Sequence, residues 1–309
     1  MRAAVIGAGH LGKHHARILA SLPGISLAGV VDTNRERATQ VATSHGTKPF
    51  GDFSEIDGKV DLVVVAVPTE SHAAVAMPLI KAGVHALIEK PIAQTIAEAD
   101  ALIGAAATAG VVLAIGHSER FNPAVAAARP HVRDPRFIEV HRLGTFPDRS
   151  LDIDVVLDLM IHDLDLILSL VSSDVAGVEA VGVPVLTPKI DIANARVRFA
   201  NGCIANLTAS RISRDPVRKI RFFQRDSYVS IDTASREVEI YKLTPQPGAL
   251  AKIGGGKLEV AGDEPLKREL EDFVAAVRDR RAPVVTGEHG RAALALAIRI
   301  VDLMNEHGN

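Results

Sequence analysis

Apolar and polar residues alternate in blocks through the first 120 residues. Short apolar runs have the length of buried strands, and the β-branched run LVVVAV at residues 62–67 is typical of a strand covered on both faces. The predicted strands are residues 2–6, 25–31, 62–67, 86–88 and 111–115. The helical stretches between them are residues 10–21, 34–45, 71–82 and 95–108. This order predicts a doubly wound parallel sheet, and we expect an α/β domain over residues 1–120.

After residue 120 the pattern changes to longer segments in which apolar and polar residues alternate, as in strands with one solvated face. These strands are expected at residues 137–143, 192–199, 203–212, 219–223, 228–231 and 238–243. Helices are expected at residues 155–171, 264–281 and 288–306, and a Gly/Pro-rich loop at residues 244–256. Residues 121–309 are therefore predicted to form an α+β domain on a mainly antiparallel sheet, with a last helix that can pack back on the first domain.

The composition is that of a soluble globular protein. The 309 residues are 47% hydrophobic and 23% charged, and the chain is long enough for two domains with cores that need no disulfides. A formal net charge of −2 gives no electrostatic reason to expect a nucleic-acid or membrane partner. The basic stretch at residues 211–225 alternates with apolar positions, so we interpret it as a strand with one solvated face.

Two features favour a cytoplasmic location. Cys203 is the only cysteine, which excludes a disulfide within the chain and fits a reducing compartment. The first apolar run is too short for a secretory signal, and the longest nearly uncharged stretch, residues 101–116, is shorter than the roughly 20 residues that a membrane span needs.

A glycine-rich turn follows the first predicted strand and begins the first predicted helix. Its sequence is Gly7-Ala8-Gly9-His10-Leu11-Gly12, a GxGxxG motif in the context that a dinucleotide site requires. The first glycine permits a tight turn, the second lets the backbone approach a pyrophosphate, and the third lets helix and strand pack closely. The alternative, a glycine-rich turn that binds nothing, is less favoured because of this context.

Asp32 ends the second predicted strand, 20 residues after the last glycine of the motif. A carboxylate there can accept hydrogen bonds from the adenosine ribose, and its charge repels a 2′-phosphate. The sequence therefore favours NAD over NADP, although Arg35 and Arg37 lie close enough to weaken that preference.

Two further turns follow predicted strands, where the carboxyl ends of a doubly wound sheet border its ligand crevice. Pro68, Thr69 and His72 follow the LVVVAV strand and are candidate cofactor contacts. The alternative is mechanical, because Pro68 can end the strand and Ser71 can cap the next helix.

The second turn is Glu89-Lys90-Pro91. A desolvated lysine beside a nicotinamide can donate or accept a proton, Glu89 can hold that lysine, and Pro91 can fix the turn. Standing alone, the tripeptide would favour a surface Lys–Glu pair.

The apolar helix expected at residues 155–171 carries Asp158, His162 and Asp165 at spacings that share one helix face. Burying such a row costs several kcal/mol unless its members are paired or functional. Zinc ligation is an alternative, but with one cysteine and no second motif histidine nearby we expect no metal.

The glycine turn, Asp32, Glu89-Lys90-Pro91 and Asp158-x-x-x-His162 occur in this order along the chain. In this combination the chain resembles the glucose–fructose oxidoreductase/inositol dehydrogenase (Gfo/Idh/MocA) family. The resemblance implies an NAD(P)-dependent dehydrogenase acting on a CH–OH group, with Lys90, Asp158 and His162 at catalytic positions. It also implies an open-faced sheet in the second domain, used for contacts in a homodimer or homotetramer.

A narrower likeness comes from residues 116–123 (GHSERFNP), Arg142-Leu-Gly and residues 155–166 (VVLDLMIHDLDL). These are similar to the bacterial UDP-N-acetylglucosamine 3-dehydrogenases, which implies a sugar or UDP-sugar substrate, with oxidation at C3 of UDP-N-acetylglucosamine as the first hypothesis. Arg120, Asn122 and Arg142 are candidates for holding cofactor or substrate, with internal salt bridges as the alternative.

Other functions on this fold remain open: a dehydrogenase of a free polyol such as inositol, an NAD-dependent glycosidase, or a cofactor-responsive binding protein like the yeast galactose-pathway repressor. The presence of Lys90, Asp158 and His162 favours catalysis. We hypothesise that Lys90 and His162 contact the reacting hydroxyl, with His162 the more natural base near pH 7 and Lys90 stabilising the alkoxide. Reversed roles are also tenable, and Asp158 would orient one of the two.

Overall fold

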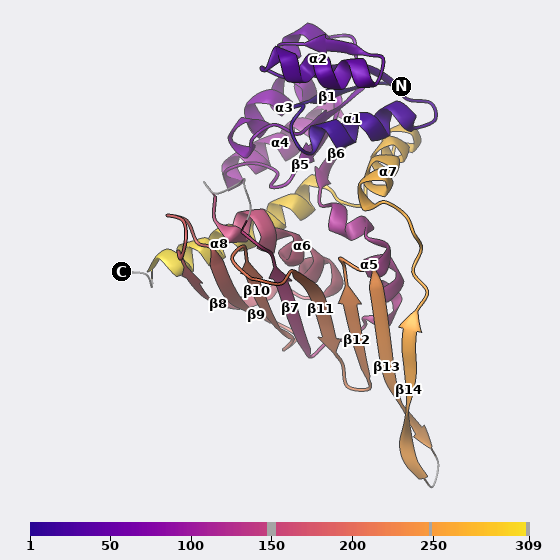
Figure 1. Cartoon of the computed structure of the whole chain (residues 1–309), viewed down its shortest axis with the longest axis vertical. Coiled ribbons are helices and arrows are strands. Elements are labelled where there is room, and N and C mark those ends of the chain that lie inside the picture. The colour runs from indigo at the N-terminus through magenta and orange to yellow at the C-terminus, as the bar shows by residue number, and fades with distance from the viewer. Residues whose placement is uncertain (147–152, 247–248, 307–309) are drawn as a thin grey trace. The chain divides into compact units, whose positions relative to one another are not determined.

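The computed structural model describes residues 1–146, 153–246 and 249–306. The chain forms two compact units. The first contains Met1–Ser118 and Glu264–Leu294, and the second contains Glu119–Asp263 and Ala295–Asn309. Figure 1 shows the elements in chain order. Among the described residues, no helix combines the length and the apolar composition needed to cross a membrane.

The first unit is built on a parallel sheet with the strand order β3-β2-β1-β4-β5-β6. Its strands are β1 (Arg2–Ile6), β2 (Ser26–Val31), β3 (Lys48–Phe50), β4 (Leu62–Val65), β5 (His85–Glu89) and β6 (Leu113–Gly116). All four residues of β4 are buried, as expected for a strand covered on both faces. The prediction of a doubly wound parallel sheet is confirmed, and only the short edge strand β3 was not expected.

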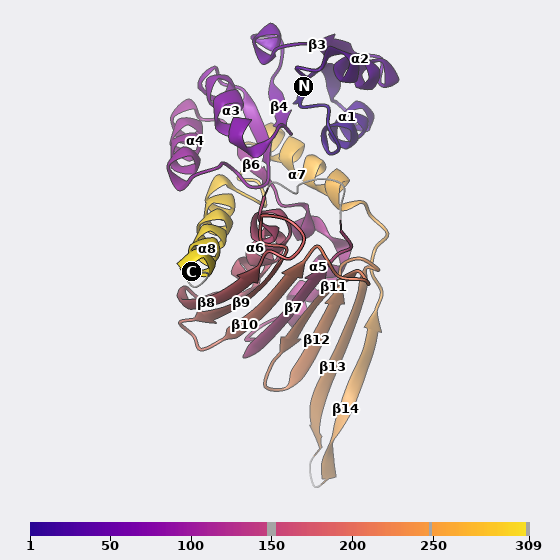
Figure 2. The ribbon, with the colours of Figure 1, turned by 60° about the vertical axis from the view of Figure 1, so that its left-hand side comes forward.

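Helices cover both faces of this sheet. They are α1 (Gly12–Ser21), α2 (Arg35–Ser44), α3 (His72–Lys81), α4 (Ile96–Ala109) and α7 (Pro265–Asp279), with 3-10 turns at Phe53–Ile56 and Thr69–Ser71. Figure 2 shows α1 and α2 on one side of the sheet and α3 and α4 on the other. Helix α7 buries Leu270 and Phe273 in a core shared with Ile18 and Leu19 of α1, so residues 264–294 join the first unit although they follow the second in sequence.

The second unit is built on a sheet with the strand order β14-β13-β12-β11-β7-β10-β9-β8. Neighbouring strands pair antiparallel except β7 and β10, which pair in parallel. The strands are β7 (Phe137–Leu143), β8 (Val175–Val183), β9 (Ile192–Phe199), β10 (Ile204–Ser210), β11 (Val217–Phe223), β12 (Ser227–Asp232), β13 (Glu237–Gln246) and β14 (Ala249–Leu258). The prediction of a mainly antiparallel sheet is confirmed. The basic stretch at residues 211–225 contains β11, with Ile220 and Phe222 facing the core.

Three described helices and several short turns complete the chain. The helices are α5 (Pro123–Ala128), α6 (Ile161–Leu170) and α8 (Gly287–Glu306), and the 3-10 turns are Ser118–Phe121 and Arg129–His131. A π-helical turn, Val156–Met160, leads directly into α6, so the single regular helix expected at residues 155–171 is two helical segments of different pitch. π-Helical turns are rare and occur frequently at functional sites.

Two sequence-based expectations for the second unit were wrong. Strand β8 was not expected, and the Gly/Pro-rich segment at residues 244–256 is not a loop, because most of it pairs in the β13–β14 hairpin. Gly255 has φ +141°, and a side chain there would overlap the carbonyl oxygen of Ile240. Glycine therefore permits a close approach of two strands here, whereas in the sequence it favoured a loop.

Candidate active site

The backbone of the glycine-rich turn shows what each glycine of the motif provides. Gly7 has φ +95°, and a side chain there would overlap the backbone of Ala66. A side chain at Gly12 would overlap the carbonyl oxygen of Gly7, so the third glycine permits the first turn of α1 to pack against β1. Gly9 faces open space, with no atom within 4 Å of the position of an added Cβ. The turn can thus present its backbone to a phosphate at the N-terminus of α1.

Asp32, at the carboxyl end of β2, is tied to the same turn. Its Oδ2 accepts a hydrogen bond from the backbone N–H of Ala8 at 2.8 Å, and its Oδ1 accepts one from Asn34 at 2.8 Å. The guanidinium of Arg37 lies 3.6 Å from the carboxylate. The structure therefore brings Gly7, Gly9, Gly12 and Asp32 together, as the sequence predicts for a dinucleotide site.

Part of this turn lines a pocket of about 530 Å³. Basic groups from the turn, α1, α2 and the residue after α2 line it, and none of its lining residues is acidic. These groups are His10, Lys13, Arg37 and His45. His10 is exposed and Leu11 half-buried, so of the two the histidine has the more accessible side chain. Positive charge of this kind suits an anionic ligand.

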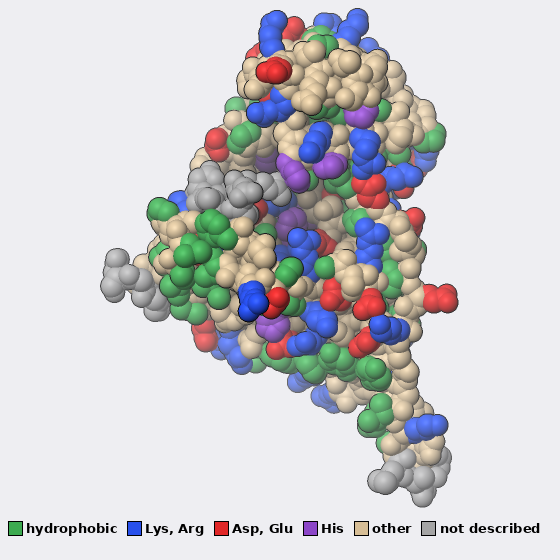
Figure 3. All heavy atoms as spheres, in the orientation of Figure 1, with side chains coloured by type: hydrophobic (Ala, Val, Ile, Leu, Met, Phe, Trp, Pro, Cys, Tyr) green, Lys and Arg blue, Asp and Glu red, His purple; other side chains and the backbone are tan. Residues whose placement is uncertain are grey.

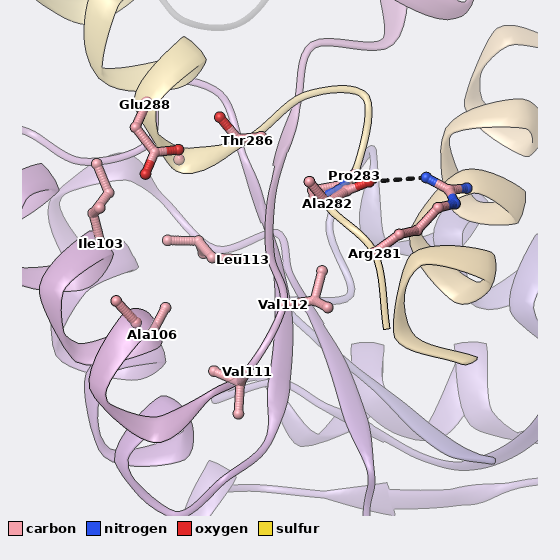
Figure 4. A pocket seen from close by; sticks show the side chains of 12 residues that line it. Ile103, Ala106, Val111, Val112, Leu113, Arg281, Ala282, Pro283, Thr286 and Glu288 are labelled. Carbon is pink, nitrogen blue, oxygen red and sulfur yellow. Dashed lines mark hydrogen bonds between the residues drawn. The ribbon is translucent and has the colours of Figure 1, made fainter. Parts of the chain in front are cut away.

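A second pocket of the first unit, of about 240 Å³, lies elsewhere. Figure 4 shows it between α4, the segment at residues 111–113 and the start of α8, with Ile103 and Leu113 pointing into it. Residues 111–113 lie at the amino end of β6, whereas the glycine turn and Lys90 follow carboxyl ends of strands. Because ligands of doubly wound sheets bind at the carboxyl edge, we do not assign the active site to this pocket.

His72 joins the two turns that follow β4 and β5. The side chain is buried, its Nδ1 lies 2.9 Å from the carbonyl oxygen of Pro91, and its Nε2 lies 3.0 Å from that of Val67. Burial lowers the pKa of His72, and the two backbone hydrogen bonds oppose that shift. His72 therefore holds the turns together.

Pro68 is exposed and Thr69 half-buried, and Ser71 makes no side-chain cap, contrary to the capping alternative.

Glu89 is the last residue of β5, and Lys90 follows it. The buried carboxylate of Glu89 accepts a hydrogen bond from Nε2 of His15 at 2.7 Å and another from the backbone N–H of Lys90 at 3.2 Å. Burial alone would raise the pKa of Glu89, but the hydrogen bond from His15 and the charges of His15 and Lys90 lower it overall. Lys90 is half-buried. His15 was missed in the sequence, where its only signal is a histidine on the apolar face of α1, beside Ala16 and Leu19.

In the second unit, Asp158 lies in the π-helical turn and His162 in the first turn of α6. Both side chains are half-buried, whereas the neighbouring Asp163 and Asp165 are buried. The four polar residues therefore divide into an accessible pair, which can meet a ligand, and a buried pair, which needs partners inside the unit.

The buried pair is neutralised by two arginines. Arg120 donates to Asp165 at 2.6 and 2.7 Å, and Arg142 donates to Asp163 at 2.7 and 2.8 Å. Arg142 also contacts Glu119 at 3.2 Å. Burial alone would lower the pKa of Arg142, but Asp163 and Glu119 raise it, so the guanidinium stays charged. For Arg120 and Arg142 the structure shows the salt bridges that the sequence left as an alternative.

Asn122 is equally occupied inside the unit. Its Oδ1 accepts from Ala124 at the start of α5, and its Nδ2 donates to Glu119 and to the carbonyl oxygen of Thr233, both at 3.1 Å. Among the described residues, no group of three or more His, Cys, Asp or Glu is arranged to hold a metal ion. Of the predicted catalytic residues, Lys90 in the first unit and Asp158 and His162 in the second are each half-buried. Side chains of these types suit proton transfer and stabilisation of an oxyanion.

Comparison with known families gives two matches along the chain. The family model described as "Oxidoreductase family, NAD-binding Rossmann fold" matches residues 1–117. The model described as "GFO/IDH/MocA C-terminal domain" matches residues 124–226. Together they cover the glycine turn, Lys90, Asp158 and His162.

Individual relatives extend the likeness over nearly the full length. UDP-N-acetylglucosamine 3-dehydrogenase from Acidithiobacillus ferrooxidans is 43% identical over 304 residues, which are 97% of this chain and 96% of that protein. A solved structure of that enzyme has a TM-score of 0.93 and 41% identity, covering 99% of this chain and 98% of that chain. The scyllo-inositol 2-dehydrogenase (NAD(+)) of Bacillus subtilis is 25% identical over 93% of this chain and 89% of its own length.

Proposed function

The chain belongs to the Gfo/Idh/MocA oxidoreductase family, and we propose that it uses NAD to oxidise the C3 hydroxyl of UDP-N-acetylglucosamine or a closely related UDP-sugar. The observation that carries this proposal is the likeness to the Acidithiobacillus ferrooxidans enzyme along almost the entire length of both chains. The group oxidised in this proposal is a sugar hydroxyl. We also propose a cytoplasmic location, because the buried Cys203 is a free thiol, which fits a reducing compartment.

The cofactor belongs at the glycine turn. We assign the pyrophosphate to the backbone around Gly9, His10, Leu11 and Gly12, because Gly9 leaves open space and α1 begins there. Asp32 favours the unphosphorylated ribose of NAD, since its carboxylate would repel a 2′-phosphate. Replacing Asp32 by Ser removes that repulsion, so the preference for NAD over NADP, measured as a ratio of Kd values, should fall.

The turns at Pro68 and Thr69 and at Glu89 and Lys90 complete the proposed cofactor side. They lie at the carboxyl ends of β4, which pairs with β1, and of β5, which pairs with β4, at the same edge of the sheet as the glycine turn. In this proposal His72 contributes by joining these turns, and Glu89 by holding the position before Lys90.

The chemistry requires loss of a proton from the hydroxyl oxygen and of a hydride from its carbon. NAD, when bound, accepts the hydride. His162 takes the hydroxyl proton, because a neutral imidazole is a suitable base near pH 7, and Asp158 orients it. The ammonium group of Lys90 stabilises the negative charge that develops on the oxygen. Each variant, Lys90→Gln or His162→Asn, should lose one limb of the pH–rate profile. If the two roles are exchanged, the limbs that the two variants lose should be exchanged as well.

The sheet of the second unit supports a homodimer or homotetramer in this proposal. Phe137, Phe223, Tyr228 and Tyr241 follow one another across β7, β11, β12 and β13, with ring centroids 5.2 to 6.4 Å apart. Phe223 and Tyr241 are exposed, as are Leu243 and Ile253 on the hairpin. Figure 3 shows hydrophobic side chains along this hairpin and also near β8. A second copy that covers such a surface would remove it from water.

The test is a substrate panel read by NADH absorbance. UDP-N-acetylglucosamine should give NADH, particularly when an aminotransferase and an amino donor remove the 3-keto product. Free glucose and myo-inositol, which lack the UDP group, should give less than about a tenth of that rate, since UDP recognition supplies binding energy. Faster turnover of myo-inositol would assign the protein to the polyol dehydrogenases of its family instead, and sugar release without net NADH would indicate glycosidase activity.

A further inference from the structure

A histidine of the cofactor helix is bonded to the carboxylate that precedes Lys90. Nε2 of His15, in α1, lies 2.7 Å from Oε1 of Glu89, and the exposed fractions of the two side chains are 0% and 8%. The other carboxylate oxygen, Oε2, accepts the backbone N–H of Lys90. Glu89 therefore links the helix that begins at the glycine turn to the backbone at Lys90.

The third side of this carboxylate is closed by β6. A side chain at Gly116 would lie 2.9 Å from Oε2 and 3.1 Å from the Cα of Glu89, so only glycine leaves the carboxylate its place. Glu89 is thus held between α1, the start of the Lys90 turn and the end of β6. Its position cannot change without breaking the bond to His15 or moving the backbone of Lys90.

Stability alone does not account for the pair. Nδ1 of His15 is buried and has no hydrogen-bond partner among the described residues, and an unsatisfied buried polar atom costs free energy. Well-packed apolar side chains in place of a buried polar pair are often neutral or stabilising. The pair also lies directly between two groups to which the proposed function gives roles, the glycine turn and Lys90.

We propose that His15 is a positioning residue for the reaction: its hydrogen bond to Glu89 fixes Lys90 relative to the helix that binds the cofactor pyrophosphate. This inference rests on the proposed function, in which Lys90 acts beside a bound nicotinamide. His15 itself contacts neither substrate nor cofactor in this account. Its loss would let Glu89 turn and Lys90 shift, and displacements of about 1 Å at a reacting group can cost about a hundredfold in rate.

Three variants separate the hydrogen bond from simple packing. His15→Leu fills the space but removes the donor, His15→Gln keeps an N–H donor of similar reach, and Glu89→Gln keeps the size of the acceptor but removes its charge. His14→Leu is the matched control, because His14 is the adjacent residue of α1 and contacts the ring of His10 instead of Glu89. If His15→Leu does not fold, His15→Gln and Glu89→Gln still carry the test.

The first readout needs no substrate. Lys90 is modified with trinitrobenzenesulfonate at one pH, with and without saturating NAD, and mass spectrometry follows the peptide that contains residue 90. Lys90→Arg identifies the signal. In the native protein, His14→Leu and His15→Gln, NAD should protect Lys90 from modification. In His15→Leu and Glu89→Gln the protection factor should fall about tenfold, while the Kd for NAD changes by less than about threefold.

The second readout is steady-state kinetics with whichever sugar the native enzyme oxidises. In His15→Leu kcat should fall about 10- to 100-fold with little change in KM, and His15→Gln should recover to within about fivefold of the native value. The double variant His15→Leu/Glu89→Gln should be no worse than the poorer single variant, because both substitutions act on the same interaction.

The outcomes are distinguishable. If NAD does not protect Lys90 in the native protein, the assignment of Lys90 to the cofactor side fails, and the role of His15 fails with it. If the native protein is protected but folded His15→Leu is protected equally, only the role of His15 is wrong. If His15→Gln is as impaired as His15→Leu, the histidine acts through packing, which also overturns the proposal.

Discussion

Arg120 and Asp165 form a buried pair in which the guanidinium donates two hydrogen bonds, at 2.6 and 2.7 Å, to one carboxylate. The exposed fractions of the two side chains are 6% and 1%. This pair explains why the acidic residue Asp165 is buried in the mainly apolar helix α6. It also separates Asp165, which has a structural partner, from Asp158 and His162, which are half-buried and to which we give roles in catalysis.

Removal of Arg120 should therefore destabilise the second unit strongly. In Arg120→Met, Asp165 is left buried without its partner, and the expected loss is about 3–5 kcal/mol in the free energy of unfolding. The double variant Arg120→Met/Asp165→Leu should recover most of it. Arg278→Met is the control, because the pair Arg278–Asp279 is exposed and its loss should leave the denaturation midpoint unchanged. Equal midpoints for Arg120→Met and the native protein would contradict this interpretation of the pair.

The second and third glycines of the motif should respond differently to alanine. Gly12→Ala places a methyl group against the backbone of Gly7, so it should lower stability by about 1–3 kcal/mol. Gly9→Ala meets no atom of the protein within 4 Å, so its thermal midpoint should stay near the native value. Its Kd for NAD should nevertheless rise at least about tenfold, because the methyl group takes the space assigned to the pyrophosphate. Native-like NAD affinity in Gly9→Ala, measured by calorimetry, would show that this space does not hold the cofactor.

Asp191 should make the stability of the second unit depend on pH in the acid range. Burial alone would raise the pKa of Asp191, but hydrogen bonds from the backbone of Leu186, Thr187 and Val185 and from the Thr187 hydroxyl lower it to about 2. Because this folded-state pKa lies below the ordinary aspartate value of 3.8, the unfolded chain binds the proton more readily. Ionised Asp191 therefore contributes about 2 kcal/mol to the free energy of unfolding. This contribution is present above about pH 4 and is lost as the pH falls towards 2.

Urea unfolding of Asp191→Asn measures this contribution. The variant should be less stable than the native protein at pH 7, and the difference should shrink between pH 4 and pH 2. A constant difference over that range would mean that the carboxylate charge of Asp191 contributes nothing.

Cys203 should be inert in the folded protein. It is 1% exposed, and burial, with the nearby charge of Asp134, raises the pKa of its thiol to about 11. The reactive thiolate is therefore scarce at pH 8. Ellman's reagent should find no reactive thiol in the native protein at pH 8 and one after denaturation in guanidinium, since the chain has a single cysteine. Rapid stoichiometric reaction in the native state would contradict the burial.

The fold could be predicted from the sequence wherever one local signal dominates. The apolar runs of the first unit, the glycine turn and the alternation in β7 and β9 gave strands at or near the observed bounds. Strand β8 was missed because Gly177 and Gly182 interrupt its pattern, although both fill packing roles: a side chain at Gly177 would meet Arg198, and one at Gly182 would meet Met304. Such contacts are long-range and leave no local periodicity.

The candidate site shows the same division. Spacing alone placed Asp158, His162 and Asp165 on one face, but it could not show that Arg120, 45 residues earlier, neutralises Asp165. It gave Lys90 a partner in Glu89, but it could not show that the same carboxylate is also bonded to His15, 74 residues away in sequence. The types of reactive groups follow from the sequence, and their pairing follows only from the fold.

The central claim is that hydride leaves C3 of the sugar for NAD, and isotope transfer tests it most directly. UDP-N-acetylglucosamine deuterated at C3 is incubated with the native enzyme and NAD, and the nicotinamide product is analysed by mass spectrometry. We predict NADH heavier by one mass unit, with no such product from Lys90→Met or His162→Asn that still bind NAD. Unlabelled NADH, or none from the native enzyme under conditions that remove the keto product, would contradict the account.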